Sequence, residues 1–185
     1  MISREEALKF LREHVQTENL VNHMLATEAV MRSLARHFAE DEDTWGLVGL
    51  LHDVDYDYTK DDPQRHAILG SEILEKRGFP PEVVRAVKAH NNGGIYPREK
   101  RIDQALFATD PTTGLIVAGA LIKKEKSLAA IDVPFLLKRM KEKSFARGAN
   151  REQIRTCTEL DLTLEAFLGL SLEAMRGIAP ELGLA

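Results

Sequence analysis

Six side chains of this sequence combine imidazole and carboxylate groups, and two of them are adjacent in the doublet His52-Asp53. The full set is His23, His52, Asp53, His66, His90 and Asp110. Imidazole nitrogens and carboxylate oxygens are ligands that a borderline divalent metal accepts without any cysteine. The sequence therefore predicts a metal site and, built on it, a metal-dependent hydrolase.

Spacing separates these histidines from the other two of the chain. His23 and His37 would lie about 21 Å apart along one helix, at a rise of 1.5 Å per residue, so they cannot bind the same ion. His37 and His14 both fall near the ends of expected helices, where a cation suits the helix dipole. Each proposed ligand also has a plainer interpretation when taken singly. His23 could be a buried histidine bonded to a neighbour, and Asp110 could cap the helix that follows it.

The composition is typical of a soluble globular protein with its own core. Of 185 residues, 44% are hydrophobic and 29% are charged, and the net charge of −4 argues against an extended nucleic-acid partner. The single cysteine, Cys157, excludes an intramolecular disulfide and a cysteine-rich zinc site, and we expect a cytoplasmic protein. The longest uncharged apolar run, 114–122, is far shorter than the roughly 20 residues that span a membrane.

Helical patterns dominate the chain, and no segment shows the sustained alternation of a strand. Ser3 and Glu6 form a capping-box pattern, and Gly78 and Pro81 are placed to end one helix and begin the next. Gly46 and Gly49 would let another helix approach closely. The expected helices cover about 20–38, 45–52, 66–76, 80–90, 102–110, 114–125 and 171–178, and others begin near residues 3, 132 and 150. The prediction is a single all-α helical bundle over 1–185, with a metal-binding part at about 1–126 and a C-terminal helical extension at about 127–185.

The ordered layout His23…His52-Asp53…Asp110 resembles the signature of the HD-domain superfamily of metal-dependent phosphohydrolases. Members of that family are all-α, and the resemblance implies that these four residues bind a metal ion. His66 and His90 match the two additional histidines of the dinuclear branch, in which Asp53 would bridge two ions. The resemblance covers residues from about 20 to 110.

Among dinuclear members, the layout is similar to bacterial diadenosine tetraphosphate hydrolases. Those proteins carry a histidine followed four residues later by glycine, here His66 and Gly70, and a histidine followed three residues later by glycine, here His90 and Gly93. The chain departs from them after Asp110, where Pro-Thr-Thr-Gly replaces the family's pattern. The cyclic-dinucleotide phosphodiesterase branch matches less well.

The resemblance implies hydrolysis of a phosphate ester or anhydride in a small nucleotide or related metabolite, with Asp53, His66 and His90 at the catalytic centre. One or two ions of Fe, Mn, Zn, Co or Mg would activate water and hold phosphate oxygens. Asp55 and Asp57 could orient metal ligands or bind the water, or could simply form a polar loop. Candidate phosphate contacts are Arg98, Lys123, Lys124, Lys143, Arg147 and Arg151, each of which could equally be a solvated surface residue.

Two other functions use the same residues. A few HD-type proteins use a di-iron centre for oxygen-dependent oxidation, and the same ligands would suit iron. A metal- or nucleotide-binding module without turnover is the third interpretation. A mononuclear enzyme is a variant of the first, in which His66 and His90 transfer protons or contact phosphate. We expect a small phosphorylated substrate as the partner, and neither extended nucleic acid nor a membrane.

Overall fold

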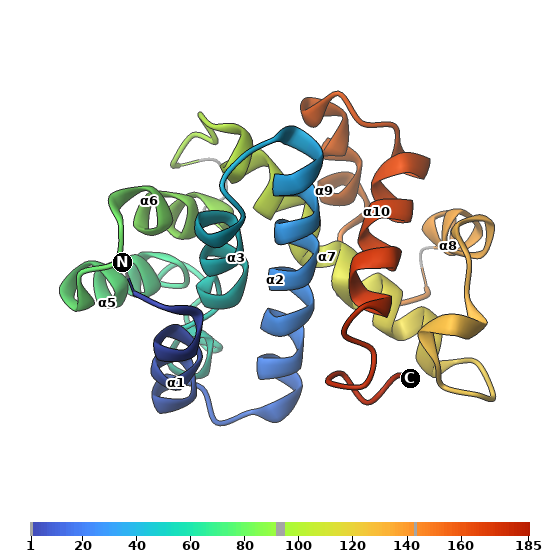
Figure 1. Cartoon of the computed structure of the whole chain (residues 1–185), viewed down its shortest axis with the longest axis horizontal. Coiled ribbons are helices and arrows are strands. Elements are labelled where there is room, and N and C mark those ends of the chain that lie inside the picture. Colours follow the sequence, from blue (N-terminus) through green and yellow to red (C-terminus); the bar gives the residue numbers. More distant parts are fainter. Residues whose placement is uncertain (1, 92–94, 143) are drawn as a thin grey trace.

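A computed structural model describes residues 2–91, 95–142 and 144–185, and every regular element in these ranges is helical (Figure 1). The all-α prediction is thus confirmed. The α-helices are α1 (Arg4–His14), α2 (Glu18–Phe38), α3 (Glu42–Leu51), α4 (Tyr56–Thr59), α5 (Ile68–Arg77), α6 (Pro81–His90), α7 (Arg101–Leu121), α8 (Val133–Met140), α9 (Arg151–Arg155) and α10 (Leu164–Arg176). Two short 3-10 helices are η1 (Leu128–Ala130) and η2 (Thr156–Leu160).

Several helix ends follow directly from the local sequence. The Ser3 side chain accepts a hydrogen bond from the backbone of Glu6, whose carboxylate accepts from the backbone of Ser3, so the capping box is present. Gly78 ends α5 with φ 84°, a left-handed conformation that costs a glycine little. Pro81 begins α6, where its missing N–H leaves no hydrogen bond unmade.

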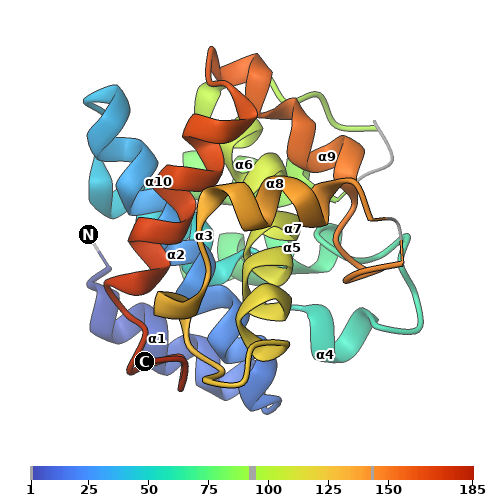
Figure 2. The ribbon, with the colours of Figure 1, turned by 90° about the vertical axis from the view of Figure 1, so that its right-hand side faces the viewer.

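The two longest helices, α2 and α7, pack against each other at the centre of the molecule. Helices α1, α3, α5 and α6 lie on one side of this pair, and α8, α9 and α10 lie on the other (Figure 1). Helix α10 contacts both α2 and α7, and α8 runs across α7 (Figure 2). The C-terminal helices therefore pack on the same central pair that carries residues of the N-terminal part.

The close approach of α3 to α2 depends on the glycine that the sequence singled out. A Cβ atom at Gly49 would lie 2.8 Å from the backbone of Glu28 and Thr27 in α2. A Cβ at Gly46 would meet the guanidinium of Arg32 at 2.6 Å. The predicted close approach of another helix is confirmed at Gly49, whereas Gly46 lies against the end of the Arg32 side chain. Since His52 directly follows α3, this contact also sets how far His52 lies from α2.

The expectation of two helices separated by Pro111 is wrong, because α7 continues through that residue. A proline inside a helix removes the N–H that would bond to the carbonyl four residues earlier, here Phe107. In this fold the Phe107 carbonyl accepts a hydrogen bond of 2.8 Å from Nε2 of Gln153 instead. A side chain from α9 thus supplies the donor that Pro111 lacks. The last helix also begins earlier than expected, at Leu164, where Thr163 caps it.

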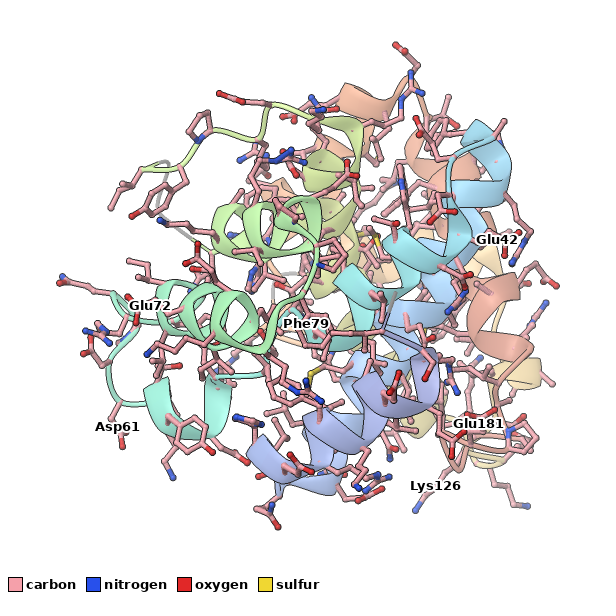
Figure 3. The ribbon with its side chains drawn as sticks, turned by 60° about the vertical axis from the view of Figure 1, so that its left-hand side comes forward. Glu42, Asp61, Glu72, Phe79, Lys126 and Glu181 are labelled. Carbon is pink, nitrogen blue, oxygen red and sulfur yellow. The ribbon has the colours of Figure 1, made fainter. Side chains whose placement is uncertain are left out.

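The core is formed by apolar side chains from both sides of the central pair, including Phe167 of α10 and Leu106 of α7. Phe79 is enclosed in it and lies 5.4 Å from the ring of Phe10, whereas Asp61 and Lys126 lie at the periphery (Figure 3). Cys157 is fully buried, and burial raises the pKa of its thiol to about 11. Among the described helices, none is both long enough and apolar enough to cross a membrane.

Candidate metal centre

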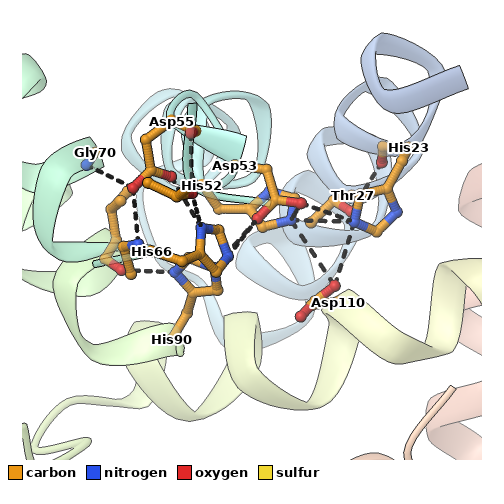
Figure 4. A network of polar contacts seen from close by, with 12 residues as sticks. His23, Thr27, His52, Asp53, Asp55, His66, Gly70, His90 and Asp110 are labelled. Atoms are coloured by element: carbon orange, nitrogen blue, oxygen red, sulfur yellow. Dashed lines mark hydrogen bonds and ion pairs between the residues drawn. The ribbon is translucent and has the colours of Figure 1, made fainter. Parts of the chain in front are cut away.

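Polar side chains from five segments of the chain meet in one network of contacts (Figure 4). His23 lies in the second turn of α2, and His52 and Asp53 follow the last residue of α3. His90 is the last residue of α6, His66 precedes α5, and Asp110 lies in the middle of α7. The structure thus brings together all six residues that the sequence singled out, from segments far apart in the chain.

One set of ligand atoms, which we call the His23 group, consists of His23, His52 and Asp110. Nε2 of His23 lies 3.1 Å from Nε2 of His52 and 3.2 Å from Oδ1 of Asp110. Oδ2 of Asp53 faces this group, at 3.8 Å from Nε2 of His23 and 3.6 Å from Nε2 of His52.

The second set, the His66 group, consists of His66 and His90, and it faces the other oxygen of the same carboxylate. Oδ1 of Asp53 lies 3.2 Å from Nε2 of His66 and 3.3 Å from Nε2 of His90. The ligand atoms of Asp53 and these two histidines all lie within 4.8 Å of one another, as do those of Asp53, His23 and His52. Asp53 therefore stands between two ligand groups and offers one oxygen to each.

Each of the four imidazoles is held by its other ring nitrogen. Nδ1 of His52 donates to the carbonyl of Gly49 at 2.8 Å, and Nδ1 of His90 donates to the carbonyl of Val87 at 2.6 Å. A carbonyl only accepts, so these bonds place the proton on Nδ1 and leave the lone pair of Nε2 directed at the centre. This is the tautomer that a metal ligand requires.

His23 reaches the same tautomer through a hydroxyl group. Oγ1 of Thr113 donates its proton to the carbonyl of Asp110 at 3.0 Å and lies 3.0 Å from Nδ1 of His23. With its own proton used in that way, the hydroxyl oxygen accepts from Nδ1–H of His23. Two imidazole lone pairs and two carboxylates then face one another, an arrangement that a cation stabilises.

His66 is oriented by Asp55, a fully buried carboxylate. Oδ1 of Asp55 accepts from Nδ1 of His66 at 3.0 Å, and its Oδ2 accepts from the backbone N–H groups of Ala67 at 2.9 Å and Gly70 at 2.8 Å. A Cβ atom at Gly70 would lie 3.2 Å from this carboxylate, so the glycine allows its close approach. Ala67 has φ 70°, an unfavourable conformation for a residue with a side chain, directly beside His66.

The buried carboxylate of Asp53 is stabilised in its charged form. Burial acts to raise its pKa, but the surrounding imidazoles, that of His52 above all, hold the pKa well below its usual range. Burial lowers the pKa of His52 to about 4, which favours the neutral ring. Burial opposes protonation of His66 as well, yet the hydrogen bonds to Asp53 and Asp55 raise its pKa to about 10. The centre thus combines anionic oxygen with imidazole nitrogen.

Asp55 and Asp57, which follow the doublet His52-Asp53, have different roles. Asp55 contacts the site through His66, as described above. Asp57 instead accepts from the backbone of Gln16 at 2.9 Å and from the hydroxyl of Thr17 at 3.1 Å, at the start of α2. Asp57 therefore stabilises a helix end and does not contact the metal centre.

The basic residues considered as phosphate contacts are dispersed, and two are held by other groups. Arg98 forms an ion pair of 3.2 Å with Glu159 and lies 3.9 Å from the centroid of the Phe107 ring. Arg151 donates to a set of backbone carbonyls in the segment before α9, and these are the carbonyls of Arg139, Glu142, Phe145, Ala146 and Ala149. This engagement makes Arg151 a residue that holds the loop, and we do not include it in the site.

The remaining cations offer no contact with the centre. Lys123 stacks on the ring of Phe135 at 4.1 Å, and Lys124 and Arg147 are exposed. Lys143 lies outside the described residues, as does Gly93. No cation among these described residues thus approaches the ligand groups closely enough to be placed in the site.

Thr113 is the residue of the site that sequence reasoning missed. A threonine within an apolar helix gives no sign of a role beyond core packing. Its partner His23 lies ninety positions away in the sequence. The only local signal is its position three residues after Asp110, on the same helix face. Gly49 allows the close approach of α2, and its carbonyl also orients His52.

Comparison with known proteins matches this sequence to one family. A model of the HD domain family matches residues 20–133, a range that contains all six proposed ligands. No solved structure matches the chain significantly.

Three similar curated proteins are each named Ribonuclease Y. The protein of Fusobacterium nucleatum is 27% identical over 73% of this chain, that of Salinispora arenicola 29% over 40%, and that of Oleidesulfovibrio alaskensis 25% over 53%. The matched segments span only 27%, 13% and 18% of those proteins' own lengths. The family model covers more than half of this chain. The matched range contains the helices that carry the ligand groups. The chain therefore belongs to the HD domain family.

Proposed function

We propose that this protein is a metal-dependent phosphohydrolase that holds two divalent ions and acts on a small phosphorylated substrate. The observation that carries the proposal is the position of Asp53, whose two oxygens face two separate sets of imidazole nitrogens. The HD domain family consists mostly of metal-dependent hydrolases, which supports the same assignment. The proposed ligands are His23, His52, Asp53, His66, His90 and Asp110.

The donor set suits ions of intermediate softness. Mixed imidazole and carboxylate ligands fit Fe, Mn, Zn or Co, whereas Mg prefers a shell of oxygen atoms. Such ions, when bound, lower the pKa of a coordinated water and offset negative charge on phosphate oxygens. Asp53 would connect the two ligand groups through its two oxygens. Asp55 and Thr113 would keep His66 and His23 in the tautomer that leaves Nε2 free.

The exposure of the ligands indicates how a substrate reaches the centre. The side chains of His23 and Asp110 are 22% and 29% exposed, whereas that of His52 is fully buried and that of His90 is 1% exposed. Solvent therefore meets the centre beside His23 and Asp110. A phosphate group would enter from this side and leave the rest of its molecule against the neighbouring surface of α2 and α7.

The proposed substrate is a small phosphate ester or anhydride, with a nucleotide as the leading candidate. The net charge of −4 gives no basis for the broad cationic footprint that extended nucleic acid requires. Because three relatives are named Ribonuclease Y, a short RNA belongs in any substrate screen. Turnover of RNA in preference to every small phosphate would contradict the small-substrate part of the proposal.

The decisive test measures metal content and turnover in the same protein preparations. Elemental analysis of protein purified without added metal should give close to two transition-metal ions per chain. A screen of nucleotides, dinucleoside polyphosphates and simple phosphate esters should then reveal hydrolysis. Asp53→Ala removes the only side chain shared by both groups, so it should lose both ions and lower turnover by about 1,000-fold or more.

The exposed Asp61 provides a matched control, since Asp61→Ala removes a carboxylate from the surface and should change neither quantity. Full metal content and turnover in Asp53→Ala would overturn the proposal. Oxygen consumption with an organic substrate, in coloured protein that releases no phosphate, would favour a di-iron oxidation at the same ligands.

A further inference from the structure

We propose that a pocket beside His23 is the subsite for a nucleobase, so that the substrate of the proposed metal centre is a nucleotide. This inference rests on the proposed function and adds the group that selects the substrate. The pocket has a volume of about 410 Å³, within the range of sites for small organic ligands. Its lining comes from the start of α2, the second half of α7 and the C-terminal segment, and comprises Asn19, Asn22, His23, Gly114, Val117, Leu121, Leu182, Gly183 and Leu184.

The pocket and the metal centre share a wall. His23 lines the pocket and directs its Nε2 at His52 and Asp110. Gly114, which also lines the pocket, follows Thr113, the residue that orients His23. His23 and Asp110 are also the more exposed ligands, so the open side of the centre adjoins the pocket. A molecule whose phosphate meets the centre would thus place its neighbouring group in the pocket.

The lining of the pocket favours a neutral group with apolar faces. Val117, Leu121, Leu182 and Leu184 form apolar walls, and no lysine, arginine, aspartate or glutamate is among the described residues that line it. Leu121, at the end of α7, is 50% exposed, a large fraction for a leucine. A second phosphate would find no cation here, and a bare sugar would leave the apolar walls without a matching surface.

Two amide side chains at the pocket are free to bind a ligand. Within the described ranges, the side chains of Asn19 and Asn22 have no hydrogen-bond partner in the protein, although each amide offers both donors and an acceptor. The edge of a nucleobase presents donors and acceptors of the same kind, while its faces are apolar. The combination of leucine and valine walls with unpaired amides matches this chemistry better than that of a lipid chain, which would leave the amides unsatisfied.

The far wall of the pocket is held in place by the C-terminal segment. The carbonyl of Leu184 accepts from the backbone of Leu128 at 2.9 Å, and the N–H of Leu184 donates to the carbonyl of Ala179 at 2.9 Å. Leu182 and Leu184 are 9% and 5% exposed. The segment beyond α10 therefore closes the pocket as a fixed wall, which gives the C-terminal part of the chain a role in selecting the substrate.

Gly114 provides the sharpest probe of the pocket. A Cβ atom at Gly114 would meet nothing within 4 Å, so a larger side chain would project into space without displacing the helix. Gly114→Leu should fold normally and fill part of the pocket. Gly148 is the matched control, because its Cβ would also meet nothing within 4 Å and it does not line the pocket.

Calorimetric titration with adenosine, guanosine, cytidine and uridine separates this inference from the function of the metal centre, because nucleosides carry no phosphate. At least one nucleoside should bind the protein as purified at millimolar concentration or below. Gly114→Leu should weaken that binding by tenfold or more, and Gly148→Leu should leave it unchanged. Asn22→Leu, which keeps the size of the side chain but removes the amide, should weaken it as well.

Kinetics with the matching nucleoside monophosphate and with ribose 5-phosphate provide the second measurement. Gly114→Leu should raise KM for the nucleotide and leave kcat/KM for the base-free ester close to that of the wild type. Absence of binding by every nucleoside, or equal binding by folded Gly114→Leu, would overturn the nucleobase subsite whatever the metal centre does. Nucleoside binding without any phosphate release would instead uphold the subsite and contradict the proposed hydrolase.

Discussion

The two ligand groups that share Asp53 are positioned in different ways. His23 and His52 lie on α2 and at the end of α3, two helices whose backbones approach closely at Gly49. His66 lies outside regular structure, before the first residue of α5. The His23 group is thus positioned by helix packing. In the His66 group, His90 lies at the end of α6, whereas His66 depends on contacts made by its own loop.

A single carboxylate, that of Asp55, makes the hydrogen bonds that position His66. Asp55 binds the ring of His66 and two backbone N–H groups at the start of α5, next to Ala67 with its φ of 70°. A strained residue persists only where its surroundings determine it. The comparison indicates that the His23 group is as stable as the fold, whereas the His66 group can be lost while the rest of the protein stays folded.

Gly49→Val tests whether helix packing positions the His23 group. The new side chain would meet the α2 backbone, which a Cβ would already approach to 2.8 Å, so α3 must move. We expect the free energy of unfolding to fall by about 3 kcal/mol, together with loss of metal from both groups. Denaturant unfolding and elemental analysis measure the two effects. Gly114→Val, in an open position of α7, should not lower stability, and equal losses in both variants would contradict the role of helix packing.

Asp55→Asn tests whether the carboxylate of Asp55 positions His66 for metal binding. An asparagine has one accepting atom, so either His66 or the N–H groups of Ala67 and Gly70 would lose their acceptor. We expect the affinity for the ion at the His66 group to fall by about 100-fold, the upper end for residues that orient ligands. Elemental analysis after dialysis against a weak chelator should then find one ion per chain instead of two.

Asp57→Asn is the matched control for that experiment. Asp57 lies two residues further on and binds Gln16 and Thr17 instead of a ligand. Two retained ions in this variant, beside one in Asp55→Asn, would support the division between the groups. Retention of both ions in Asp55→Asn would show that the His66 group does not depend on this carboxylate.

Thr113→Val tests the hydrogen bond between Thr113 and His23, which supports the His23 group in addition to helix packing. Valine keeps the shape of threonine but cannot accept from Nδ1 of His23, which is bonded to the hydroxyl at 3.0 Å. Helix packing still holds the ring, so we expect a loss of about tenfold in affinity for the ion at the His23 group, the lower end for residues that orient ligands. Competition with a chromogenic chelator measures it. A loss as large as that of Asp55→Asn would remove the contrast between the two groups.

Gln153→Leu lies outside both groups and should have the smallest effect. It removes the donor to the Phe107 carbonyl, which Pro111 already leaves without its helical partner. We expect the free energy of unfolding to fall by about 1 kcal/mol, with no change in the number of bound ions. Loss of an ion in this variant would mean that the position of Asp110 depends on the hydrogen bond from Gln153 of α9 to the Phe107 carbonyl of α7.

Local sequence predicted the helices well where a cap or a break is encoded nearby. The capping box at Ser3, the start of α6 at Pro81 and the end of α5 at Gly78 all follow from neighbouring residues. Pro111 misled the prediction because the residue that compensates it, Gln153, lies in another helix. Residue patterns record the penalty of a proline but not the remote donor that offsets it.

The candidate site could be predicted as a set of residues but not as an arrangement. The sequence singled out all six side chains, and their convergence is a finding of the structure, while their role as metal ligands stays a prediction. The shared position of Asp53 was implied by the resemblance to dinuclear HD-type proteins, but the bond between Thr113 and His23 and the pocket closed by Leu184 had no visible sign in the sequence.

The sequence by itself determined the chemical character of the centre, because residue types fix which groups can accept a proton or a metal. It also determined the helices, since their periodicity and caps are local properties. Only the tertiary structure decided which imidazoles meet, which nitrogen of each ring is free and which surface adjoins the centre. Those features depend on how helices distant in sequence pack against one another, and that packing is set by the whole core rather than by any one segment.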